Sequence, residues 1–159
     1  MKKLIYILLG LIIIGGIACN EEDEPEYVGS WVTTQQTLCG EAQNKLTLTE
    51  SNFTVIVSQK ISTNLYIDVA GIKGGLAVTE NNVVLTPSAV ASIDSTGSTG
   101  LVWYEKGSDE YNAINDDFFE IPDNVTGEYE INGDELTMKM DNNGDGEYGT
   151  DEILVYTRL

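Results

Sequence analysis

Short runs of alternating apolar and polar residues follow one another from residue 28 to the end of the chain. The stretches KLTLT at 45–49 and LTMKM at 136–140 alternate at a period of two. This period is typical of strands that bury one face, because successive side chains point to opposite sides. Further β-rich runs lie at 28–37, 53–57, 65–69, 76–79, 83–86, 101–104, 128–131 and 153–159. The pattern predicts eight or nine strands.

Turn-forming residues separate these runs, and they predict hairpins. Asn132-Gly133 between two alternating runs is the strongest short-range hairpin signal in the chain. The exception is 108–119, where Tyr111, Ile114 and Phe118 recur at a helix-like spacing, which predicts one short helix or a loop. We therefore expect an all-β fold, a single antiparallel up-and-down β-barrel, with a β-sandwich as the alternative.

The first residues of the chain have a different pattern. Lys2 and Lys3 precede an apolar run from Leu4 to Ile17. A basic start, a short apolar segment and small residues at its end predict a secretory signal peptide at 1–18. The run is shorter than the roughly 20 apolar residues that a membrane-spanning helix needs. Ordinary secretion and a retained helix are the alternatives.

The end of this segment, Gly16-Ile17-Ala18-Cys19, resembles the bacterial lipobox, although Gly16 stands where Leu is usual. The resemblance implies that Cys19 carries fatty acyl chains, palmitate among them. Cys19 then becomes the N-terminus of a membrane lipoprotein. Residues 19–27 then form an acidic tether, which is either a plain spacer or, by resemblance, an export signal of surface lipoproteins. We expect an outer-membrane, cell-surface protein, with a periplasm-facing one as the alternative.

The charge of the chain is strongly negative. Its net charge is −18, and removal of Lys2 and Lys3 leaves six basic side chains against 26 acidic ones, a net charge of −20. Such a surface repels phosphate backbones, which excludes nucleic acid as a partner. The segment 28–159 is long enough for one domain with its own core.

The residue types that commonly carry catalysis are scarce. The chain has no His, which removes the commonest general base and the commonest transition-metal ligand. Cys39 has no neighbouring cation to activate it, so a structural role is favoured. The acidic residues stand in no recognisable catalytic motif, so we expect no enzyme activity; a hydrolase that uses two carboxylates is the weakest alternative.

Two short motifs at the ends of the barrel segment resemble the lipocalin family. Gly29-Ser30-Trp31 matches the Gly-x-Trp start of lipocalins, and Tyr156-Thr157-Arg158 resembles the end of small bacterial lipocalin-like domains. The hairpin at 128–140 is similar to that family as well. The resemblance implies a barrel in which Arg158 covers Trp31 at the closed end. Without it, Trp31 is a core residue and Arg158 a surface one.

The segment 141–152 matches the calcium-loop pattern D-x-[DN]-x-[DN]-G-x₅-E over its full length. Ca²⁺ takes six to eight oxygen ligands. The candidate ligands are the side chains of Asp141, Asn143 and Asp145, the backbone of Glu147 and the carboxylate of Glu152. Strand-like runs flank the loop, so we expect a structural calcium clip rather than a sensor. The alternative is an acidic hairpin loop without metal.

These observations favour a membrane-anchored lipocalin-like barrel that binds a small apolar or amphipathic ligand. Trp103, Tyr66 and Tyr104 are candidates for lining its cavity. The alternative is a calcium-stabilised structural or interaction module of the cell envelope without enzymatic activity. The sequence identifies no protein partner.

Overall fold

The computed structural model describes residues 24–37, 40–93, 100–115, 121–141, 144–150 and 152–159. Within these residues the chain forms nine strands and one short α-helix, which confirms the all-β prediction. The elements are β1 (Gly29–Thr37), β2 (Gly40–Leu48), β3 (Asn52–Ser62), β4 (Leu65–Thr79), β5 (Asn82–Ile93), β6 (Leu101–Glu105), α1 (Asp109–Ile114), β7 (Val125–Asn132), β8 (Glu135–Asp141) and β9 (Ile153–Arg158).

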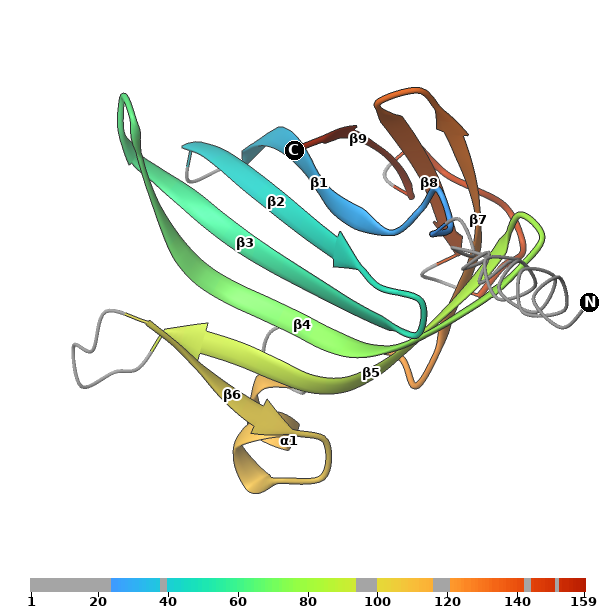
Figure 1. The fold of residues 1–159 in the computed structure, drawn as a ribbon. Helices are drawn as coiled ribbons and strands as arrows, with labels where there is room; N and C mark the ends of the chain where they lie inside the picture. The colour runs from blue at the N-terminus through green and yellow to red at the C-terminus, as the bar shows by residue number, and fades with distance from the viewer. Residues whose placement is uncertain (1–23, 38–39, 94–99, 116–120, 142–143, 151) are drawn as a thin grey trace, which may run out of the picture.

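Eight of these strands close into an antiparallel barrel (Figure 1). Their order is β4-β3-β2-β1-β9-β8-β7-β5, and the additional pairing of β4 with β5 completes the ring. Pairing of β4 with β5 closes the ring, and closure reduces the number of unpaired backbone groups in small up-and-down barrels. This architecture is consistent with a lipocalin-like fold, and the sandwich alternative is wrong.

The ninth strand, β6, lies outside the ring because β5 changes partner along its length. The first part of β5 pairs with β7, from Asn82 to Leu85, and its last part pairs with β6, from Ala89 to Ile93. Pro87 stands between the two ladders. Proline has no N–H to donate, so the ladder with β7 ends before it.

The apolar core fills one half of the barrel, around the start of β1 and the end of β9, which we call the closed half. Its buried members are Trp31, Leu46, Leu48, Phe53, Leu76, Val83, Leu136, Met138, Met140 and Tyr156. Each such side chain contributes roughly 1.5–3 kcal/mol through burial. A hollow among them measures only about 10 Å³, at the limit of what holds one water molecule. The closed half is therefore packed.

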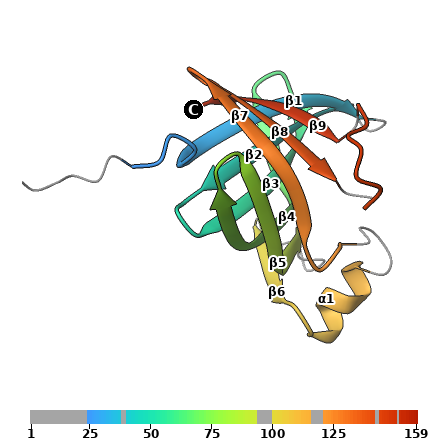
Figure 2. The same cartoon turned by 90° about the vertical axis from the view of Figure 1, so that its right-hand side faces the viewer.

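Two local predictions are refined by the structure. The β7–β8 hairpin is present, but its two-residue turn is Gly133-Asp134, with Asn132 still paired to Glu135. Gly133 takes a positive φ of 64°, which glycine adopts without strain. Tyr111 and Ile114 of the helix-like spacing lie in α1, whose N-cap Ser108 accepts a hydrogen bond from the Tyr111 N–H, while Phe118 lies outside the described residues. Figure 2 shows α1 beside β6, away from the N-terminal segment.

Candidate functional site at the open half of the barrel

The barrel's inner face consists of rows of side chains that run across neighbouring strands. One row begins in the closed half at Trp31, ends on β6 beside the ring, and is apolar throughout: Trp31, Leu46, Val55, Ile72, Val90 and Tyr104. Trp31, Leu46 and Val90 are buried, with Trp31 0% exposed. Because side chains alternate along a strand, residues two positions further on share this inner face.

The next inner row has a different composition and a different exposure. It consists of Thr33, Asn44, Val57, Ala70, Ser92 and Val102, paired in that order across six strands. None of the six is buried, and Val102 is 36% exposed. Polar and apolar side chains mix along the row. We call it the open row. Its members are partly exposed to solvent, so the row suits an amphipathic ligand better than a purely apolar one.

Only one of the three aromatic side chains expected in a cavity faces inward. Tyr104 pairs with Val90 on the inner face. Trp103 pairs with Ala91 on the outer face, where the Lys73 ammonium lies 5.0 Å from its ring centroid. The expectation for Trp103 was wrong because neighbours in a strand point to opposite faces, and the sequence did not show which face was inner.

Tyr66 is likewise an outer-face residue, so its expected role in a cavity was also wrong. Its hydroxyl donates to Glu41 Oε1, and Lys60 Nζ lies 2.9 Å from the same oxygen. The hydrogen bond from Lys60 holds the pKa of Glu41 below its usual range. Hydrogen bonding to Glu41 raises the pKa of Lys60 and of Tyr66. The cluster joins β2, β3 and β4, and a tyrosine that holds its proton more tightly is a poor nucleophile.

The two residues of the lipocalin resemblance meet at the closed end. The Arg158 guanidinium carbon lies 4.1 Å from the Trp31 ring centroid. Its Nη2 donates to the Glu26 carbonyl at 2.7 Å and its Nη1 to the Val28 carbonyl at 3.3 Å. The Trp31 Nε1–H donates to the Tyr27 carbonyl at 3.0 Å. This is the arrangement that the resemblance implies, and it fixes residues 26–28 across the closed end.

Gly29 makes room for this contact. Its φ is +145°, and Arg158 Nη1 lies 3.1 Å from the place where a Cβ would be. A larger residue would strain the backbone and crowd the guanidinium. The glycine of the Gly-x-Trp motif thus has a structural reason here.

The acidic loop lies between β8 and β9, at the opposite end of the barrel. Asp141 accepts the Gly144 N–H at 2.6 Å and the Gly146 N–H at 3.1 Å. Glu152 is 5% exposed and accepts the Gly149 N–H at 2.9 Å. Within the described residues, no three His, Cys, Asp or Glu side chains gather closely enough to hold a metal ion.

The remaining candidate ligands have different positions. Asp145 Oδ1 accepts the Glu147 N–H at 2.8 Å, while Asn143, like Cys19, lies outside the described residues. The described carboxylates of the loop therefore shape its backbone rather than converge on one point. Calcium binding stays a prediction.

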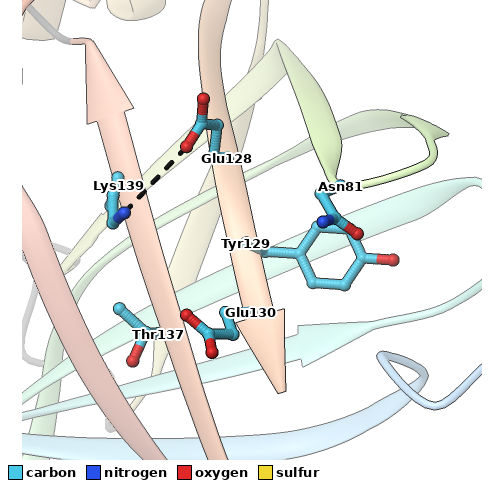
Figure 3. A pocket seen from close by; sticks show the side chains of 6 residues that line it. All are labelled: Asn81, Glu128, Tyr129, Glu130, Thr137 and Lys139. Atoms are coloured by element: carbon cyan, nitrogen blue, oxygen red, sulfur yellow. Dashed lines mark ion pairs between the residues drawn. The ribbon is translucent and has the colours of Figure 1, made fainter.

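A shallow groove of about 210 Å³ lies on the outer surface near the β4–β5 turn (Figure 3). Its lining is Asn81, Glu128, Tyr129, Glu130, Thr137 and Lys139. Figure 3 shows Lys139 beside Glu128, at 4.0 Å. Because the groove is mainly polar and open to solvent, it is less suited to an apolar ligand than the open row.

Neither a protein-family model nor a curated protein matches the chain. In the described part of the chain, no helix has the length and apolar character needed to cross a membrane. Sequence analysis missed the open row because its members are small and unremarkable residues from six strands, and only their pairing brings them together.

Proposed function

We propose that this chain is a lipid-anchored, lipocalin-like barrel of the outer membrane that binds a small amphipathic ligand on its open row. The contrast between the two inner rows carries the proposal. Trp31, Leu46 and Val90 pack a filled core, whereas no member of the neighbouring row is buried. A packed closed end beside a partly exposed inner row is compatible with a small barrel that holds one small ligand.

The geometry of the termini supports an orientation for the anchored protein. Arg158 holds residues 26–28, the N-terminal part of the described chain, at the closed end. Figure 2 shows the blue start of the described chain, from residue 24, and the C-terminus near the same end of the barrel. Anchoring through Cys19 would then direct the open half away from the membrane. The open row would meet ligands from the aqueous side.

Titration with the neutral fluorescent probe N-phenyl-1-naphthylamine tests ligand binding. We expect the probe's emission to rise when wild-type protein is added. The rise should be much smaller with Val57→Glu, which places a charge in the open row. The matched control is Thr54→Glu on the same strand, whose side chain belongs to the opposite face and is half-buried. Equal thermal melts of the two variants show that both fold.

Either of two results would contradict the proposal. One is the absence of any probe response from the wild type at millimolar probe or at its solubility limit. The other is an equal loss of response in the Val57 and Thr54 variants, which would mean that the probe does not contact the inner face.

A second proposal is that calcium stabilises the β8–β9 connection. The protein would then be a structural or interaction module of the cell envelope without enzymatic activity. The match of residues 141–152 to the calcium-loop pattern over its full length favours it, together with the place of this loop between β8 and β9. Asp141, Asn143, Asp145 and Glu152 would supply side-chain oxygens, and Glu147 a carbonyl. The ion would offset the repulsion among carboxylates within one loop.

A further inference from the structure

The seam between β1 and β9 is hydrogen-bonded only at the closed end. The two strands pair at Trp31–Arg158 and Val32–Thr157, and the Leu159 N–H donates to the Ser30 carbonyl at 2.9 Å. Beyond Val32 the register would place Thr34 opposite Val155 and Gln36 opposite Ile153. No such pairs form, although all four residues are described. The β1–β9 ladder therefore ends after the pair Val32–Thr157.

The direction of the backbone groups on both strands follows from the bonds that do form. Ser30 bonds towards β9, so even-numbered residues of β1, Thr34 and Gln36 among them, present their N–H and C=O groups to the seam. Arg158 donates its N–H to Asp134 on the β8 side. Odd-numbered residues of β9, such as Ile153 and Val155, therefore face β1. Two unpaired edges border the seam.

Both edges are accessible. Thr34, Gln35 and Gln36 are exposed, although they belong to a regular strand. On β9, Val155 is 47% exposed and Ile153 is 37% exposed. Unpaired strand edges of this kind are templates for the addition of another strand. The side chains of Ile153 and Val155 supply apolar surface beside the open edge.

The charge around the seam indicates what kind of strand fits. The acidic loop with Asp141, Asp145 and Glu147 leads into Ile153, and the whole chain has a net charge of −18. Complementary charge favours encounter with a basic partner and repels a second copy of this acidic chain.

We propose that the β1–β9 seam binds an extended peptide with basic residues, which adds as a strand to the exposed edge of β1. The Thr34 and Gln36 backbone groups hydrogen-bond to the peptide backbone. Apolar peptide side chains cover Ile153 and Val155, and its basic end lies against the acidic loop. This site is separate from the open row and does not depend on the ligand proposed for it.

Fluorescence anisotropy tests the proposal with a labelled short peptide of alternating valine and threonine that ends in lysines. We expect Thr34→Pro to weaken binding by about tenfold or more, because it removes a donor at the seam without removing a native hydrogen bond. Thr34→Val keeps the N–H and is the matched control, expected to bind within about twofold of wild type. A peptide N-methylated at alternate residues should not bind.

The same experiment separates the competing outcomes. Hydrogen exchange of the Thr34 and Gln36 amides should slow when the peptide is added, which places it on β1. Equal binding of the N-methylated peptide or of the Thr34→Pro variant would overturn the proposal, as would no binding at millimolar peptide. A wild-type dimer in sedimentation that Thr34→Pro dissociates would overturn it in favour of self-pairing.

Discussion

At the residue scale, two neighbouring glycines of β4 differ in what surrounds them. A Cβ on Gly74 would lie 2.1 Å from the Thr86 carbonyl oxygen, whereas the nearest atom to a Cβ on Gly75 is 4.0 Å away. Gly74 shares the inner face with Phe53, close to the bulge where β4 and β5 shift register. The close approach of two backbones explains why only glycine fits there.

Gly74→Ala should therefore destabilise the barrel by about 3 kcal/mol, through overpacking against backbone that cannot move freely. Gly75→Ala should change the free energy of unfolding by less than about 1 kcal/mol, because space is available. Denaturant unfolding of both variants measures the difference. Equal stability of the two would mean that the β4–β5 approach at Gly74 is not as described.

Tyr156 gives a pH dependence to stability. Burial raises the pKa of Tyr156 to about 12, from about 10 in an unfolded chain. The folded state holds the phenolic proton more tightly, so this stability is fully present below pH 10. It is lost as the pH rises towards 12. The expected loss is about 3 kcal/mol, at roughly 1.4 kcal/mol for each pH unit.

Thermal or denaturant unfolding between pH 9 and pH 12 checks this, with Tyr156→Phe as the comparison. The variant keeps the ring in the core and lacks the titrating hydroxyl, so its stability should fall less steeply. Other groups, such as Lys60 and Tyr129, contribute equally to both proteins. Parallel pH profiles for the two would contradict the assignment to Tyr156.

At the scale of elements, the β8–β9 loop shows how far a sequence motif determines a site. The pattern at 141–152 identified an unusual loop, and the structure places it between two strands, as expected. The described carboxylates accept backbone N–H groups instead of converging on one point. A spacing pattern gives the order of ligands along the chain but not their convergence, which depends on the backbone path.

If the loop binds calcium, excess Ca²⁺ should raise the melting temperature of residues 20–159 by several degrees over chelator, as mass action requires. Asp141→Ala should abolish this gain. Asp134→Ala, in the turn at the other end of β8, is the control and should keep it. An unchanged melt of the wild type at millimolar calcium would leave only an acidic turn.

Pro87 is the element-scale feature that sequence analysis left unused. The sequence predicts a strand over 83–86, and the structure continues β5 through Pro87 to Ile93. The N–H of a strand residue points to only one of the two neighbouring strands, so a proline removes a hydrogen bond on one edge only. The strand therefore continues, but exchanges β7 for β6 on that edge.

At the scale of the whole molecule, the closed end brings together residues 26–28, the Trp31–Arg158 contact and the C-terminus. The open half lies at the far end, with the open row and the acidic loop. This polarity follows from the up-and-down order, in which alternate connections fall at opposite ends. The proposed anchoring through Cys19 would leave the other end accessible.

Membrane anchoring is tested at this scale by Cys19→Ser expressed from the full chain in a Gram-negative host. We expect wild-type protein in the membrane fraction and the variant in the soluble envelope fraction, because the variant lacks the acylated thiol. Metabolic labelling with a palmitate analogue should mark only the wild type. Membrane retention of an unlabelled variant would mean that acylation of Cys19 is not the anchor.

The sequence by itself determined the all-β class and the hairpin at 128–140, and it predicted eight or nine strands, although the runs 65–69 and 76–79 belong to one strand, β4. These follow from local periodicity and turn chemistry, which need no knowledge of distant residues. It also directed attention to Trp31 and Arg158, because the chain has a single arginine and a Gly-x-Trp start.

Only the tertiary structure decided which face of each strand is inner, where β5 changes partner and where the β1–β9 ladder ends. A shift of one residue in register exchanges the two faces of a strand, so Trp103 and Tyr104 could not be distinguished beforehand. The open row joins residues from six strands. The seam is the part of the β1–β9 boundary beyond Val32 and Thr157, where the two strands do not pair. Neither leaves a pattern along the chain, because both depend on pairing between segments far apart in sequence.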